Sequence, residues 1–293
     1  MLTRKVLPAV LILLGIYAVF LRAETAAWLF HPAPFPDGDW ATARIYHAQE
    51  LHIPLANGGY LDAWQIPAYQ PARTVLYFHG RHGNLTNLSA HFSKLRDLRS
   101  DVIAIDYPGY GKSPGRPSIS GLYPDGEAAY QYVTNQLRVP PARLVVQGDE
   151  IGSAVAAQVA AQHPEVAGLV LESPFPSLRR WANSLAPLAG WLLPGEMDVS
   201  SSVARYPGPK LMIYGSGDAA IAPELSHAVF LAASDPKAEH VVADAGTSDL
   251  LLAAGDDYGY WNGELYAQAH LATPAEVPHG PAPTLFLGRP IIH

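Results

Sequence analysis

The chain has 293 residues, of which 49% are apolar, and its 19 Lys and Arg against 26 Asp and Glu give a formal net charge of −7. This size is sufficient for one large domain with additional segments, and the acidic balance argues against nucleic acid as a partner, since phosphate binding needs a basic surface. Because the chain has no Cys, it contains no disulfide, no thiolate metal site and no lipid-modified cysteine.

The N-terminal segment, residues 1–27, has the composition of a membrane anchor. Two basic residues precede an apolar run over residues 6–21, which is short for a span and also fits a signal-peptide core. A weak small-residue site at residues 25–27 leaves cleavage open. We favour an uncleaved anchor in the lipid bilayer, because residues 28–30 continue as an interfacial apolar segment. The basic flank predicts a single-pass protein with a cytoplasmic N-terminus and the main domain on the outer side, which fits a periplasm.

Two strands with polar loops follow. An apolar run at residues 74–78 leads into a loop that begins with His79 and Gly80. The segment DVIAIDYPGYGKSPGRPS predicts a second strand that ends in a Pro/Gly-rich loop, and residues 121–137 are predicted to be helical.

The segment LVVQGDEIGSAVAAQVA predicts a buried strand, a sharp turn and a helix of small residues. Gly148 and Gly152 flank the turn, and their missing Cβ atoms permit strained backbone and close approach of the helix. Glu150 stands between them at a helix N-terminus, where unpaired N–H groups favour negative charge. In the Gly-x-nucleophile-x-Gly elbow the central residue is normally Ser. A carboxylate there makes this position decisive for whether the protein is an enzyme.

Three further strands are predicted at residues 168–175, 210–218 and 239–244. Strands that alternate with helix-length segments indicate an α/β fold, with a mainly parallel central sheet flanked by helices. Active groups are expected at the C-terminal strand ends. Residues 176–209 form a short cap insertion, either a packed helical excursion or a membrane-facing or substrate-covering segment.

The C-terminal segment, residues 266–293, holds five Pro among mixed apolar residues. Proline at this density disfavours regular structure and predicts an extended tail. Its apolar content is too high for a freely solvated linker, so the tail is expected to wrap its own domain or dock on another protein.

In order and spacing, the segments FHGRHGN, DYPGYGKSPGRPS, GDEIGSAVA, LESPF, GSGDAAIAP and AGTSDLLLAAGDDY resemble the motifs of α/β-hydrolases. They most resemble the single-anchor, membrane-bound type related to lysophospholipases and depalmitoylases. The resemblance covers residues 28–265 and implies the α/β-hydrolase fold. It also implies that the oxyanion hole is built from the loop at His79 and Gly80 and from the N–H of Ile151.

The resemblance places Glu150 at the nucleophile, Asp218 at the triad acid and Thr247 at the position of the His. Two of three catalytic positions therefore depart from the pattern. Thr247 has no group that titrates near neutral pH, so it cannot activate a nucleophile or water. Glu150 itself could attack a substrate, as the Asp of dehalogenase-type members does, but hydrolysis of the resulting ester needs a base. A milder interpretation has Glu150 fill the space of the missing imidazole and bond Thr247 or a backbone donor.

Other side chains near these positions have simpler interpretations. Ser153 is expected to bond back to its own helix, and His82 to stabilise its loop. Glu150, Asp218, Asp249 and His82 could together suit a divalent cation, but no ligand pair has a local metal-binding spacing. We predict no metal and no cofactor.

The sequence thus predicts a membrane-anchored α/β-hydrolase-fold protein that has lost hydrolase activity and serves as a binding or assembly subunit of a membrane protein complex. One alternative is an active esterase, lipase or peptidase on small acyl substrates. Another is a small-molecule receptor that uses the old pocket. Whether the chain is an enzyme stays open, with Glu150 and Thr247 weighing against it.

Overall fold

The computed structural model describes residues 29–187, 190, 193 and 197–269. The predicted anchor over residues 1–27 lies outside this part of the chain. Of the predicted extended tail, residues 266–293, those from residue 270 onward also lie outside it, whereas residues 266–268 are helical and end α10 (Asp257–Gln268). Within the described residues, no helix combines the length and the apolar character that crossing a bilayer requires.

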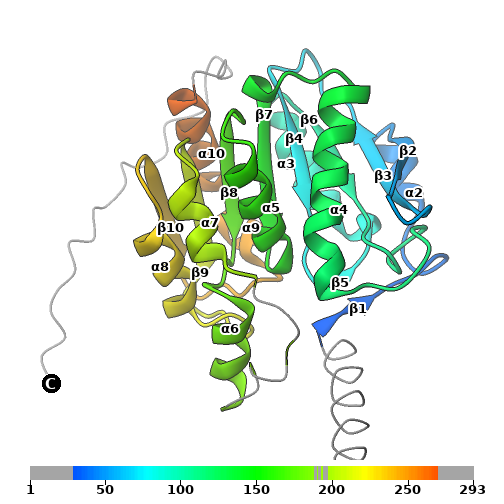
Figure 1. Cartoon of the computed structure of the whole chain (residues 1–293). Coiled ribbons are helices and arrows are strands. Elements are labelled where there is room, and N and C mark those ends of the chain that lie inside the picture. The colour runs from blue at the N-terminus through cyan, green and yellow to red at the C-terminus, as the bar shows by residue number, and fades with distance from the viewer. Residues whose placement is uncertain (1–28, 188–189, 191–192, 194–196, 270–293) are drawn as a thin grey trace, which may run out of the picture.

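An eight-stranded sheet forms the centre of the domain, with the order β10–β9–β8–β7–β4–β6–β3–β2 (Figure 1). Its strands are β2 (Gln49–Pro54), β3 (Tyr60–Ile66), β4 (Arg73–Phe78), β6 (Ser100–Ile105), β7 (Leu144–Asp149), β8 (Gly168–Glu172), β9 (Lys210–Gly215) and β10 (Lys237–Val242). β3 is antiparallel to both β2 and β6, and all other pairings are parallel. The predicted mainly parallel sheet is confirmed. A separate two-stranded parallel sheet joins β1 (His31–Pro32) to β5 (His82–Gly83).

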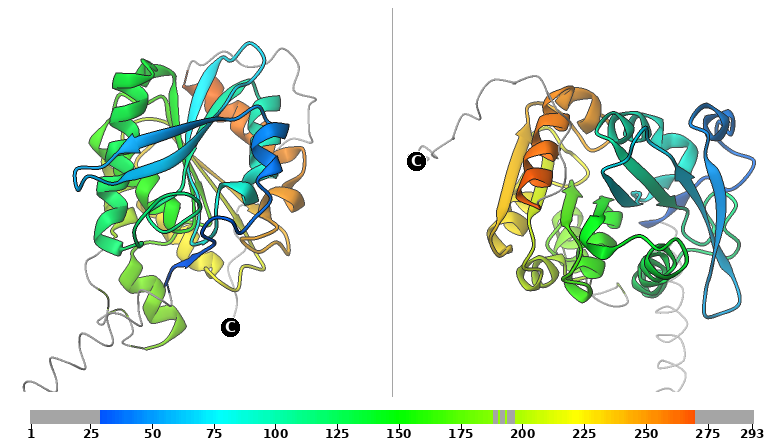
Figure 2. Two further views of the ribbon diagram at one scale, coloured as in Figure 1. Left: turned by 90° about the vertical axis from the view of Figure 1, so that its right-hand side faces the viewer. Right: turned by 90° about the horizontal axis from the view of Figure 1, so that it is seen from above.

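Helices cover both faces of the large sheet (Figure 2). The α-helices are α2 (Ala41–Ile45), α3 (Ser89–Asp97), α4 (Ile119–Gln131), α5 (Ile151–Gln162), α6 (Leu178–Leu185), α7 (Val199–Arg205), α8 (Pro223–Ala232), α9 (Leu250–Ala254) and α10 (Asp257–Gln268). Short 3₁₀ turns span Leu85–Leu88 and Pro141–Arg143, and a π-helical turn spans Tyr132–Gln136. One apolar core lies between the sheet and α4, α5, α7 and α8, and a second lies between the sheet and α3, α9 and α10.

The segment predicted as a cap contributes to the main domain. Its helices α6 and α7 bury Leu178, Trp181 and Val203 in the same core as α4 and α5. The described part of this segment therefore matches a packed helical excursion. The predicted helix over residues 121–137 begins earlier, at Ile119, and its last turn is the π-helical one.

Candidate functional site

The turn between β7 and α5 has the strained geometry of a nucleophile elbow, with Glu150 at its apex. Glu150 has φ 46° and ψ −111°, a conformation that is unfavourable for residues other than Gly. A Cβ on Gly148 would stand 2.1 Å from the carbonyl oxygen of Gly152, and one on Gly152 would stand 2.0 Å from that of Phe78. Both glycines are therefore needed where the helix crosses the strands.

The carboxylate of Glu150 is buried against the loop after β4, which was expected to supply one oxyanion donor. Glu150 is 4% exposed, and its Oε2 accepts a hydrogen bond from the backbone N–H of Arg81 at 3.3 Å. The same oxygen lies 3.6 Å from Nε of Arg81. Burial raises the pKa of Glu150, while Arg81 acts in the opposite direction. The N–H of Arg81, in the loop after β4, thus binds the protein's own Glu150 carboxylate. Ile151, the other expected donor position, is buried at the first residue of α5.

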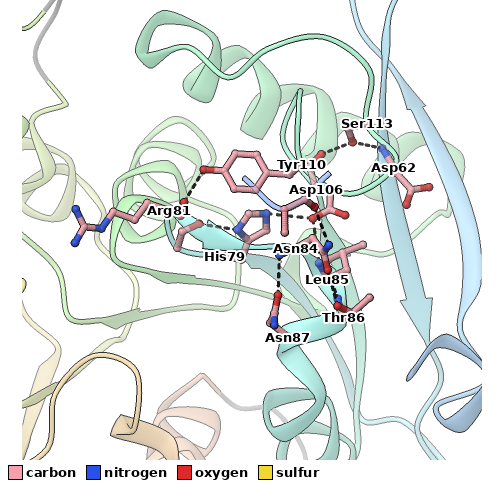
Figure 3. A network of polar contacts seen from close by, with 12 residues as sticks. Asp62, His79, Arg81, Asn84, Leu85, Thr86, Asn87, Asp106, Tyr110 and Ser113 are labelled. Carbon is pink, nitrogen blue, oxygen red and sulfur yellow. Dashed lines mark hydrogen bonds and ion pairs between the residues drawn. The ribbon is translucent and has the colours of Figure 1, made fainter. Parts of the chain in front are cut away.

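Buried polar groups fix the loop that carries Arg81 (Figure 3). His79 is buried, with Nδ1 2.6 Å from the carbonyl oxygen of Gly80 and Nε2 3.4 Å from Oδ1 of Asp106. The hydroxyl of Tyr110 donates to the carbonyl oxygen of Arg81 at 2.7 Å. Burial raises the pKa of Asp106, and His79 counteracts this shift. His79 therefore positions the loop through contacts on both of its ring nitrogens.

The network continues from Asp106 to a second buried carboxylate, Asp62 (Figure 3). The hydroxyl of Ser113 donates to the carbonyl oxygen of Asp106 at 2.6 Å and accepts from the N–H of Asp62 at 2.7 Å. Among the described residues, neither carboxylate oxygen of Asp62 has a hydrogen-bond partner, and the exposed ring of His52 is 3.7 Å away. Burial, with a smaller contribution from Asp106, raises the pKa of Asp62 to about 7.

Asp62→Asn is expected to stabilise the protein at alkaline pH. Because the folded chain keeps the Asp62 proton to a higher pH than the unfolded chain, stability falls as the pH rises through this window. The amide removes the buried charge, so we expect a gain of about 2 to 4 kcal/mol near pH 8 and little change near pH 4. Urea unfolding at both pH values measures the gain, with exposed Asp37→Asn as the control. Equal effects of the two variants would contradict this account.

Thr247 takes the hydrogen bond that a catalytic His would make to Asp218. Asp218 is buried, and its Oδ1 accepts from the N–H groups of Ala220 and Ile221 at 2.9 Å each. Its Oδ2 accepts from the hydroxyls of Ser173 at 2.9 Å and Thr247 at 2.5 Å. The acid position is therefore fully hydrogen-bonded, yet its partner at residue 247 cannot carry a proton between nucleophile and leaving group.

A pocket of about 490 Å³ joins most of these groups. Among the residues that line it are His79, Gly80, Arg81, His82, His91, Asp149, Glu150, Ala220, Asp218 and Thr247. The pocket thus brings together the three degenerate triad positions and the loop after β4. Ser153 lies behind the elbow, where its hydroxyl donates to the carbonyl oxygen of Glu150 at 2.5 Å.

The residues considered as metal ligands do not form a common site. Asp249 accepts a hydrogen bond from the N–H of Gly246 at 2.8 Å, and the ring of His82 stacks on that of His31 at 4.7 Å. Across the part of the chain that the structure describes, no three His, Asp or Glu side chains are grouped so that they could hold a metal ion.

His91, which lines the pocket, forms an ion pair that the sequence analysis missed. Nε2 of His91, on α3, lies 3.0 Å from Oε2 of the buried Glu172. Oε1 of Glu172 accepts from the Gln147 amide at 2.5 Å and from the Tyr258 hydroxyl at 2.7 Å. Burial favours the protonated acid, but His91 and the other donors outweigh it and lower the pKa of Glu172. The imidazole of His91 is thus paired with Glu172 rather than with Glu150.

Asp149, beside the elbow, adds a further carboxylate to the pocket. Burial and the charge of Glu150 raise the pKa of Asp149, and its Oδ1 has no hydrogen-bond partner in the described structure. The sequence did contain one signal for the hydrogen-bond network around Glu172. Gln147 lies within an apolar strand and Glu172 lies at the end of one, and a polar side chain in such a place needs a buried partner.

Comparisons with known proteins agree with this fold. A family model described as alpha/beta hydrolase fold matches residues 73–200. The uncharacterized protein YfhR of Escherichia coli O157:H7 is 30% identical over 253 residues, which are 82% of this chain and 87% of that protein. Protein bem46 of Schizosaccharomyces pombe is 27% identical over 265 residues, 84% of this chain and 87% of its own. An esterase from Pyrococcus furiosus, 18% identical, has a similar structure with a TM-score of 0.68 over 82% of this chain and 98% of its own. The chain therefore belongs to the alpha/beta hydrolase fold family.

Proposed function

We propose that this protein is a membrane-anchored pseudohydrolase, which has lost serine-type hydrolysis and serves as a binding or assembly subunit of a membrane protein complex. The contact between Glu150 and the N–H of Arg81 carries the first part of the proposal. In a serine hydrolase this donor region stabilises the oxyanion of the tetrahedral intermediate. A resident carboxylate satisfies the donor in the resting protein and repels a second anion.

The base position supports the same conclusion. Thr247 is hydrogen-bonded to Asp218, where an imidazole would be needed both to activate the nucleophile and to activate water. Three His residues, His79, His82 and His91, line the pocket, and Nε2 of His91 is paired with Glu172. The site therefore retains the acid and the strained elbow of a hydrolase without a nucleophile–base pair.

The retained pocket favours a second candidate, a small-molecule receptor. Its volume of about 490 Å³ falls within the range of small-ligand sites. The similar Pyrococcus furiosus protein is described as an esterase. A receptor of this kind would bind a small molecule in the pocket without hydrolysing it, because the triad is incomplete.

The membrane and partner parts of the proposal rest on sequence. The apolar run over residues 6–21 has the composition of an anchor, and the Pro-rich tail with its apolar residues suits a docking segment. Purification of the native protein in a mild detergent tests the partner. A monomer with no co-purifying protein would contradict an assembly role.

A fluorophosphonate probe tests the loss of serine chemistry directly. The native protein is expected to remain unlabelled, because the probe modifies only a Ser activated by a neighbouring base. An active serine hydrolase of the same fold, labelled in the same membrane preparation, provides the positive control. Labelling of any Ser in the native chain, identified by peptide mass spectrometry, would favour the esterase alternative instead.

A further inference from the structure

The rim of the pocket is joined to the N-terminal end of the described chain. Leu29 and Phe30 are buried in the core, and β1 follows immediately. The N–H of His31 donates to the carbonyl oxygen of Arg81 at 2.9 Å, on the loop whose N–H contacts Glu150. The rings of His31 and His82 stack on each other, and His82 lines the pocket. The chain therefore enters the domain at the mouth of the pocket.

Helix α6 lies at the same edge of the molecule as β1 and β5 (Figures 1 and 2). The indole N–H of Trp181 donates to the carbonyl oxygen of Ala220, a pocket residue, at 2.8 Å. The guanidinium of Arg81 lies 5.2 Å from the centre of the Trp181 ring. These contacts make α6 the second side of the pocket rim.

The outer surface of this rim combines cationic and large apolar side chains. On α6, Arg179 and Arg180 are exposed and Leu185 is 46% exposed. Beside β1, Phe35 is 56% exposed, and the Lys112 ammonium, which is ion-paired with Glu50, lies 5.8 Å from its ring. Basic and apolar side chains together are typical of surfaces that rest on anionic lipid.

The distance along the sequence restricts where this rim can lie relative to a membrane. The apolar run ends at residue 21, and only residues 22–28 separate it from the first described residue. Whatever their conformation, seven residues span at most about 25 Å. An anchor at residues 6–21 therefore holds the pocket rim close to the bilayer.

We propose that the pocket rim, defined as β1, β5 and α6, docks on an anionic bilayer surface, so that the pocket opens toward the lipid. This inference rests on the proposed membrane anchor. The chain as a whole carries a net charge of −7, so an anionic surface repels most of the molecule and selects a cationic face. Because Asp37 and Asp39 are exposed next to Phe35, the electrostatic attraction is assigned to Arg179 and Arg180 on α6.

Single-cysteine labelling tests the docking, because the chain contains no native Cys. Leu185→Cys and Phe35→Cys, in the full chain, are labelled with a fluorophore and reconstituted in vesicles of phosphatidylcholine and phosphatidylglycerol that contain spin-labelled lipid. Both labels are expected to lose most of their fluorescence to the quencher. Tyr69→Cys is the control, because Tyr69 is aromatic, 82% exposed and placed between β3 and β4. Its label is expected to keep its fluorescence.

The charge requirement is tested with Arg180→Glu in the Leu185→Cys background. We expect quenching to fall to the level seen in vesicles of phosphatidylcholine alone, whereas Arg138→Glu, an exposed site just before β7, leaves quenching unchanged. Protein that sediments with vesicles but shows equal quenching at residues 35, 185 and 69 overturns the docking while the anchor stands. Protein that does not sediment with vesicles overturns both.

Discussion

The double variant Glu150→Ser/Thr247→His is expected to gain serine-hydrolase activity. The elbow already holds residue 150 at φ 46°, and Asp218 is already hydrogen-bonded to the side chain at residue 247. Ser at residue 150 also releases the N–H of Arg81 for an oxyanion. Hydrolysis of short acyl esters is expected to rise roughly 10²- to 10⁴-fold over the native protein, because nucleophile and base act as a unit. Fluorophosphonate labelling of residue 150 provides a second measurement.

Two further variants provide the controls for this gain. Glu150→Ser alone is expected to fold normally and remain unlabelled, because no base lies beside the new hydroxyl. Glu150→Ala/Thr247→His has the base without the nucleophile, so it is expected to stay inactive. A folded double variant with no labelling would mean that the elbow and residue 247 are not arranged as a triad. Equal activity in the native protein would contradict the proposed loss of function.

The parallel strands and the elbow were predictable because short-range chemistry determines them. Apolar runs that end in Gly or Asp mark buried strands. Gly148 and Gly152 lie where α5 packs against backbone carbonyl groups, so a side chain there would not fit. The β2–β3 hairpin was missed, although β2 alternates between exposed and buried residues and Asn57 and Gly58 mark the turn. These strands are antiparallel and lie at one edge of the sheet, so they follow a different pattern from the parallel core.

The site was predictable only as far as the family motifs reached. Asp218 and Thr247 were assigned by resemblance, and the structure places them in contact. The contact of Glu150 with Arg81 depends on the path of a loop 69 residues away in sequence. The pair of His91 and Glu172 joins positions 81 residues apart, with no motif to connect them. Such contacts follow from the packing of the sheet and its helices, which local sequence patterns do not encode.

Gly152→Ala is expected to destabilise the protein by about 3 kcal/mol or more, although Ala is the better helix former. An added Cβ would stand 2.0 Å from the carbonyl oxygen of Phe78 and 2.6 Å from that of His79, both fixed backbone atoms. Helix α5 would have to move away from β4, and Glu150 would move away from the loop that carries Arg81. Urea unfolding of the full chain measures the free energy of unfolding.

The matched control is Gly259→Ala, also within a helix. Its Cβ would meet only side-chain atoms of Leu98 and Lys94, at 3.6 and 3.9 Å, so helix propensity predicts a gain of roughly 0.5 to 1 kcal/mol. The two substitutions are chemically identical and are expected to have opposite signs. A small or stabilising effect at Gly152 would mean that α5 does not pass so close to β4. The carboxylate of Glu150 would then not be held against the loop after β4, and the part of the proposed loss of hydrolase activity that rests on this contact would fail.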